Sequence, residues 1–139
     1  GPERKNILRL IKEWNLEKSV RYLSRLPNTE VRRLYPHAIA LLLASLPTPV
    51  WQEQFGYVLV EAMSAGCPVI GTISGSIPDV VGRGGILVAP GNPVELRKAM
   101  KSLDSMDKGL LAAEFEKIKA RFSAARFQKE LIDIYSDLC

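Results

Sequence analysis

The stretch Glu53-Gln54-Phe55-Gly56-Tyr57-Val58-Leu59-Val60-Glu61-Ala62-Met63 carries two glutamates separated by seven residues. We expect Glu53 in a loop and Glu61 two turns into the helix that follows. If all the intervening residues were helical, the two carboxylates would point the same way, roughly 12 Å apart, which is the span of a nucleotide sugar. Gly56 lets a ligand approach the backbone, and the free N–H groups of Tyr57 and Val58 can hold a diphosphate. The run therefore predicts sugar, phosphates and ribose, bound in that order.

On either side of this run, apolar segments alternate between helical and strand-like patterns. The predicted helices are 3–14, with its apolar face inward, 28–37, 55–65, 92–103, 107–121 and 123–138, and the segment 75–81 is predicted to form a loop and a short helix. The predicted strands are 20–23, 38–44, which reads as buried on both faces, 68–72 and 86–88. This alternation indicates an α/β fold, a Rossmann-like parallel sheet with helices on both faces. Ligands bind such sheets beyond the carboxyl ends of the strands, where the loops 24–27, 45–56 and 73–78 lie.

The run that starts at Glu53 continues through Glu61-Ala-Met-Ser-Ala-Gly-Cys-Pro-Val-Ile-Gly71. In this form it resembles the signature of retaining glycosyltransferases with the two-domain GT-B fold, the "group 1" or family 4-like sugar transferases. The flanking segments 20–27, 75–82 and 85–92 resemble that family as well, in the same order. The resemblance implies that residues 1–139 are the C-terminal domain, which binds the nucleotide-sugar donor, and that the N-terminal acceptor domain is absent from this sequence.

The resemblance also implies roles for single residues. Glu53 would be the catalytic residue, binding hydroxyls of the transferred sugar and favouring positive charge at the anomeric carbon. Glu61 would pair with both ribose hydroxyls. The other residues implied in donor binding are Phe55, Gly56, Tyr57, Val58, Gly75 and Ser76, the last in place of a second glycine in the family pattern. Simpler readings stay open, in which Glu53 is a helix N-cap, Glu61 a surface glutamate, Gly56 a turn glycine and Phe55 a core residue.

The implied reaction moves a sugar from a nucleoside diphosphate sugar to a glycan, lipid or small-molecule acceptor, with its anomeric configuration retained. The resemblance implies no cofactor and no obligatory metal. The Arg and Lys pair that neutralises the donor phosphates in the family is missing here, so we expect this piece alone not to turn over. Two alternatives remain, a GT-B phosphorylase or epimerase domain and a non-catalytic nucleotide-binding or interaction module.

Composition excludes several other classes of protein. With 139 residues and 47% hydrophobic content, the chain can form one core, and it has no apolar run of about 18 residues and no apolar signal segment at its start. We therefore expect a cytoplasmic location. The net charge of +4 would attract anionic donors or a lipid-linked acceptor, and peripheral membrane association of the full enzyme is a further expectation. No nucleic-acid-binding module is recognisable. Cys67 and Cys139 lack metal-ligand spacing, and Cys67 reads as a small buried filler.

The last predicted helix carries an apolar stripe. Ser123 can cap this helix, and Phe127, Leu131, Ile134 and Leu138 recur at helical spacing. In the family that the chain resembles, the corresponding helix crosses back to the other domain. We therefore expect this stripe to fold back onto its own domain, to pair with a second copy of the chain, or to fray.

Overall fold

The computed structural model describes residues 2–138, so Gly1 and Cys139 lie outside the described part. The chain forms two units, Gly1–Val31 and Arg32–Cys139. The first unit holds helix α1 (Arg4–Glu13), an irregular segment, and the beginning of helix α2 (Asn28–Leu34). Helix α1 is amphipathic, yet none of its residues is buried.

Two predictions for the first unit are wrong. The apolar face of α1 does not pack inward, and residues 20–23 form no strand in the part of the chain that the structure describes. A strand exists only where a neighbouring strand completes its backbone hydrogen bonds, and the described residues supply no such neighbour for this segment. Its apolar residues Val20, Tyr22 and Leu23 remain exposed.

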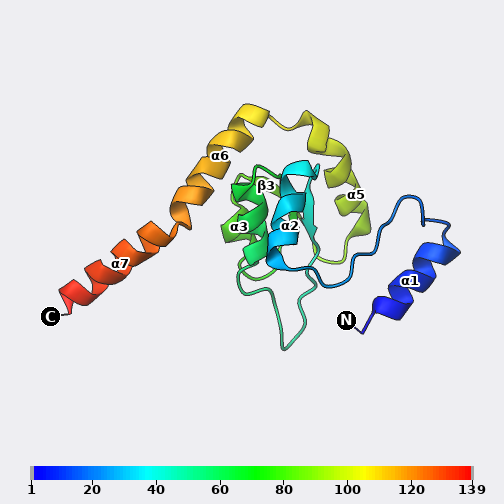
Figure 1. The fold of residues 1–139 in the computed structure, drawn as a ribbon, viewed down its shortest axis with the longest axis horizontal. Helices are drawn as coiled ribbons and strands as arrows, with labels where there is room; N and C mark the ends of the chain where they lie inside the picture. Colours follow the sequence, from blue (N-terminus) through cyan, green and yellow to red (C-terminus); the bar gives the residue numbers. More distant parts are fainter. Residues whose placement is uncertain (1, 139) are drawn as a thin grey trace. The chain divides into compact units, whose positions relative to one another are not determined.

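The second unit is built on a parallel sheet (Figure 1). Within residues 2–138 the sheet has three strands in the order β1 (Leu41–Leu43), β2 (Val69–Thr72) and β3 (Gly85–Val88). In register, Leu41 lies opposite Val69, which lies opposite Gly85. The connecting and flanking elements are the short helices η1 (Tyr35–His37) and η2 (Leu103–Ser105) and the helices α3 (Tyr57–Ser64), α4 (Ile77–Val81), α5 (Pro93–Ser102), α6 (Lys108–Arg121) and α7 (Ala124–Asp137). The predicted α/β class is confirmed.

Helices cover both faces of the sheet, as predicted. Ile70 and Gly71 are consecutive in β2, so they face opposite sides. Ile70 belongs to a buried cluster with Val88 and Ala99, and Ala99 comes from α5. On the other face, a Cβ built on Gly71 would lie 2.6 Å from Cγ2 of Ile77, so α4 packs directly against the backbone of the strand.

The strands differ in burial. Every residue of β2 is buried, as expected of the central strand, and Val69 is completely inaccessible. The prediction that residues 38–44 are buried on both faces is wrong, since Leu42 is exposed and Ile39 is 77% exposed. The reason is position, because β1 is an edge strand of the described sheet and is covered less fully.

Polar side chains cap the helices of the C-terminal half, and the cap predicted at Ser123 is confirmed. The side chain of Asn92 accepts from the N–H of Glu95 at the start of α5, and that of Ser123 accepts from the N–H of Arg126 at the start of α7. Asp107 accepts from two backbone N–H groups at the start of α6. Each such cap satisfies donors that a helix start leaves unpaired.

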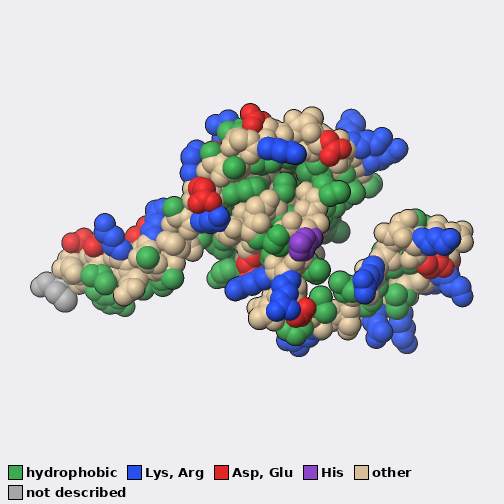
Figure 2. All heavy atoms as spheres, turned by 45° about the horizontal axis from the view of Figure 1, so that its top comes forward, with side chains coloured by type: hydrophobic (Ala, Val, Ile, Leu, Met, Phe, Trp, Pro, Cys, Tyr) green, Lys and Arg blue, Asp and Glu red, His purple; other side chains and the backbone are tan. Residues whose placement is uncertain are grey.

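Helix α7 does not fold back onto its own unit, because none of its residues is buried and Phe127 is 65% exposed. Figure 2 shows hydrophobic side chains along one side of this helix and charged side chains along the other. The helix is continuous from Ala124 to Asp137, so it also does not fray over that range. Pairing with a second copy stays a prediction. Among residues 2–138, no helix is both long and apolar enough to cross a bilayer.

Candidate functional site

The start of α3 is shaped by Gly56, which adopts a left-handed conformation with φ 75°. This conformation favours glycine, and it ends the loop abruptly, so the helix begins at Tyr57 rather than at the predicted residue 55. Glu61 is consequently one turn into the helix and not two. No side chain caps this helix start. The prediction that Glu53 might serve as its N-cap is therefore wrong.

The loop that carries Glu53 is held by main-chain contacts to a second loop. The N–H of Ser76 donates to the carbonyl oxygen of Glu53 at 3.2 Å. A Cβ built on Gly75, which has φ +53°, would lie 1.8 Å from that same oxygen. Only glycine fits at this contact, because both the backbone conformation and the lack of space exclude a side chain. Residue 53 is thus bonded to residue 76 backbone to backbone, and Gly75 lies in close contact with it.

Side chains at the ends of two strands extend this contact. The hydroxyl of Thr72, the last residue of β2, donates to the carbonyl oxygen of Ser45 at 2.7 Å. The hydroxyl of Ser45, just beyond β1, donates to Oε2 of Glu53 at 3.2 Å. Sequence reasoning missed both residues. The signal that could have identified them is their position at the carboxyl ends of adjacent parallel strands.

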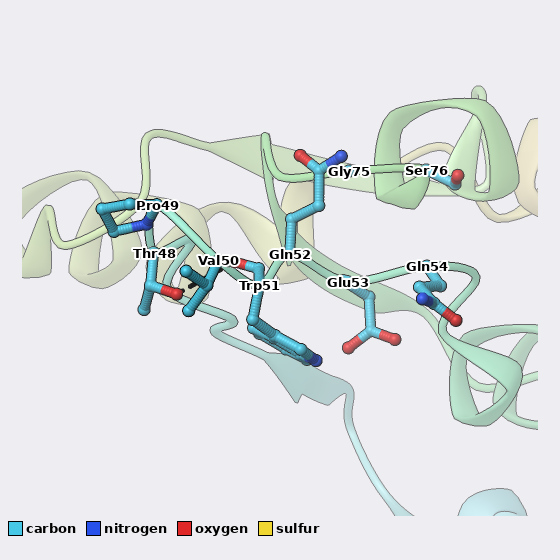
Figure 3. A pocket seen from close by; sticks show the side chains of 9 residues that line it. All are labelled: Thr48, Pro49, Val50, Trp51, Gln52, Glu53, Gln54, Gly75 and Ser76. Carbon is cyan, nitrogen blue, oxygen red and sulfur yellow. Dashed lines mark hydrogen bonds between the residues drawn. The ribbon is translucent and has the colours of Figure 1, made fainter.

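A hollow of about 850 Å³ opens beside this loop, lined by residues 48–54 together with Gly75 and Ser76. In Figure 3 the carboxylate of Glu53 and the indole of Trp51 point to the same side of the loop, while Gln52 points the other way. The alternation is that of an extended chain. Within this lining Glu53 supplies the one carboxylate. Three predicted site residues, Glu53, Gly75 and Ser76, therefore meet here.

Phe55 and Tyr57 line a different hollow of about 560 Å³, whose other walls come from residues around the junction of α6 and α7. The ring of Phe55 lies 4.6 Å from that of Tyr57 and 5.3 Å, edge to face, from that of Phe122. The guanidinium of Arg121 lies over the Phe122 ring, 4.9 Å from its centroid, at the distance of a cation–π interaction. Phe55 is thus a packing residue of this aromatic cluster and only partly buried.

Glu61 lies in a third hollow of about 350 Å³ that also includes Arg32 and Tyr35. Its Oε1 accepts from Arg32 at 3.2 Å, and its Oε2 accepts from the hydroxyl of Tyr35 at 3.2 Å. Val60 lines both this hollow and the aromatic one, so the two adjoin on α3. The ion pair with Arg32 is largely open to solvent and contributes about 0–1 kcal/mol to stability.

The structure therefore divides the predicted site residues among three hollows around α3. Gly56 is buried at the helix start, and Val58 is exposed on the first turn. Ser76 already uses its N–H for Glu53, so its hydroxyl is the group left to face a ligand. Among residues 2–138 no three His, Cys, Asp or Glu side chains gather as metal ligands would. The absence of an obligatory metal stays a prediction.

Cys67 is confirmed as a buried residue. Its side chain is 1% exposed, and its thiol donates to the carbonyl oxygen of Pro68 at 3.4 Å. Burial raises the pKa of the Cys67 thiol above its ordinary value, because the thiolate would lose its hydration. The residue fits the predicted role of a small filler rather than a nucleophile.

We predict that Thr72→Val lowers the free energy of unfolding by about 1 to 3 kcal/mol, since it leaves the Ser45 carbonyl without its donor in a buried region. Chemical denaturation followed by circular dichroism would measure this. Thr48→Val is the matched control, because Thr48 is exposed and its hydroxyl reaches the Trp51 carbonyl only at 3.4 Å. Equal losses in the two variants would contradict the structural role given to Thr72.

We compared the sequence and the fold with those of known proteins. The family model described as "Glycosyl transferases group 1" matches residues 1–121. D-inositol 3-phosphate glycosyltransferase of Corynebacterium kroppenstedtii is 32% identical over 132 residues, which are 92% of this chain and 28% of that protein.

Two solved structures show the same fold. Sucrose-phosphate synthase of Thermosynechococcus elongatus superposes with a TM-score of 0.78 at 25% identity, over 99% of this chain and 35% of that one. Anabaena Alr3699/HepE, solved in complex with UDP, superposes with a TM-score of 0.80 at 23% identity, over 96% of this chain and 36% of that one. The same protein was also solved with UDP-glucose. The chain thus spans only about a third of the length of the relatives it matches.

Proposed function

This chain belongs to the group 1 glycosyl transferases, and from that membership we propose that it is the donor-binding part of an enzyme that transfers a sugar from a nucleoside diphosphate sugar to an acceptor. The observation that carries the proposal is the placement of two carboxylates around the start of α3, Glu53 in a fixed loop and Glu61 one turn into the helix. The UDP bound by HepE supports a nucleoside diphosphate as the ligand class.

Each part of the donor has a partner of suitable chemistry. The carboxylate of Glu61 accepts hydrogen bonds from ribose hydroxyls. The uncapped N–H groups of Tyr57 and Val58, at the positive end of the α3 dipole, bind the diphosphate. Glu53 and the hydroxyl of Ser76 face the transferred sugar from the hollow of about 850 Å³.

We further propose that the transfer retains the anomeric configuration. The bond between the anomeric carbon and the diphosphate oxygen breaks, and the electron pair leaves with the diphosphate. The acceptor oxygen bonds to the same face of that carbon and gives its proton to the departing phosphate oxygen. Glu53 stabilises the positive charge that develops on the sugar, because a carboxylate near the anomeric carbon binds the transition state better than the ground state. In this proposal a single carboxylate, that of Glu53, acts at the anomeric carbon, whereas glycosidases place two carboxylates around the bond that breaks.

Titration calorimetry of this chain with UDP, GDP and ADP tests the proposal. We expect one of the three to bind, and we expect Glu61→Ala to weaken that binding by about 1 to 3 kcal/mol, or about 5- to 150-fold, as for hydrogen bonds to a charged group. Glu116→Ala is the matched control, because Glu116 is a well-exposed glutamate on α6. If no nucleotide binds at millimolar concentration, the donor site is not formed by this chain.

A further inference from the structure

The carboxylate of Glu61 accepts hydrogen bonds from a segment of the chain that is distant in sequence. Both of its partners, Arg32 and Tyr35, come from the segment that runs from α2 into η1, 29 and 26 residues before Glu61. Each partner contacts a different oxygen, Arg32 the Oε1 and Tyr35 the Oε2. The orientation of this carboxylate is therefore decided by α2 and η1 as well as by its own helix.

The two partners are not equivalent. Tyr35 is 4% exposed, and it opens η1, where Pro36 restricts the backbone. The Arg32 side chain is 65% exposed, so it can leave the carboxylate at little cost. A buried ring has few alternative rotamers, and its hydroxyl is therefore the partner that holds the carboxylate in one place.

The chemistry of the tyrosine hydroxyl suits this task. It donates one hydrogen bond without carrying a charge, so both oxygens of Glu61 keep lone pairs that can accept from a ligand. Burial, and then the charge and hydrogen bond of Glu61, raise the pKa of Tyr35 above its ordinary value. The hydroxyl therefore stays protonated, and stays a donor, throughout the neutral range.

We infer that Tyr35 is a positioning residue for nucleotide recognition, holding the Glu61 carboxylate in the orientation in which it accepts from the ribose hydroxyls. This inference rests on the proposed function, in which Glu61 binds ribose. Tyr35 acts through Glu61 and not on the nucleotide. At 3.2 Å its hydrogen bond is long for two oxygens, so the effect of losing it is severalfold rather than complete.

The test compares UDP with 2′,3′-dideoxy-UDP, which lacks the ribose hydroxyls, by titration calorimetry on the same chain. If GDP or ADP is the nucleotide that binds, it and its dideoxy analogue take the place of this pair. The unsubstituted chain should prefer UDP. Tyr35→Phe removes only the hydroxyl, and we expect it to weaken UDP binding about three- to tenfold while leaving the dideoxy analogue unchanged. Tyr135→Phe on α7, where the ring is 67% exposed, is the matched control and should bind both ligands as the unsubstituted chain does.

Repeating the comparison in a chain that carries Glu61→Gln tests whether Tyr35 acts through the Glu61 carboxylate. If Tyr35 acts through Glu61, adding Tyr35→Phe to this background should change the preference for UDP by less than about twofold. Equal weakening of UDP and the analogue by Tyr35→Phe, or no change in either, would overturn the inference while the proposed function stands. Failure of the unsubstituted chain to bind any of UDP, GDP and ADP, or equal affinity for the nucleotide that binds and its dideoxy analogue, would overturn the ribose role of Glu61 and this inference together.

Discussion

Gly75→Ala is expected to lower the free energy of unfolding by about 2 to 5 kcal/mol, the sum of a left-handed conformation imposed on alanine and an overpacked contact. The conformation at Gly75 has φ +53°, and the new Cβ would meet the Glu53 carbonyl oxygen at 1.8 Å. Neither atom belongs to a flexible side chain, so relief requires one of the two loops to move. Urea denaturation followed by circular dichroism would give the free energy directly.

Gly66→Ala separates the two contributions. Gly66 also has a positive φ, +80°, but nothing lies within 4 Å of the Cβ that alanine would add. This control should therefore lose only the conformational part, about 1 to 2 kcal/mol. If Gly75→Ala lowered the free energy of unfolding no more than Gly66→Ala does, the close contact between residues 53 and 75 would not be what fixes the loop at the site.

Leu59→Ala is expected to cost about 2 to 5 kcal/mol, the usual range for deleting a fully buried leucine side chain. Leu59 is 0% exposed, and its Cδ1 lies 3.0 Å from where a Cβ on Gly56 would stand, so it packs directly under the turn that starts α3. The resulting cavity should loosen that turn, and we expect nucleotide affinity measured by calorimetry to fall together with stability.

Leu138→Ala provides the comparison for this second substitution. Leu138 is 77% exposed at the end of α7, and its replacement should change stability by no more than about 0.5 kcal/mol. A loss at Leu59 as small as the loss at Leu138 would mean that α3 is not anchored by its buried face. Unchanged nucleotide affinity in a destabilised Leu59→Ala chain would instead contradict the role of the α3 start in binding phosphate.

The sequence correctly predicted those parts of the fold whose signal lies within a few neighbouring residues. The apolar runs at β2 and β3, the helix starts near Asn92 and Asp107 and the cap at Ser123 carry their signal within a few residues, and the structure confirms them. The strand at 20–23 failed for the opposite reason, because strand formation depends on a partner that no local pattern reveals. The same dependence explains why β1 is shorter and more exposed than its leucine run suggested.

The candidate site divides in a similar way. Glu53, Gly56 and Glu61 stand out in sequence because glycine and carboxylates are unusual within an apolar helix start. The groups that orient them do not, since Tyr35 reads as an ordinary apolar residue of a helix and Ser45 as an ordinary loop residue. Their contacts to Glu61 and Glu53 join segments that only folding brings together. The sequence thus named the candidate groups, whereas the residues that support them were found only in the structure.

The backbone contacts of residue 53 with residues 75 and 76 do not depend on which side chain stands at position 53. The carbonyl oxygen of residue 53, which every amino acid possesses, makes the contacts to Gly75 and Ser76. Exchanging the glutamate for another residue therefore gives up the hydrogen bond from Ser45 but keeps these backbone contacts, provided that Gly75 stays. The loop itself thus restricts position 75 more tightly than position 53, where, under the proposed function, it is the chemistry of sugar transfer that requires a carboxylate.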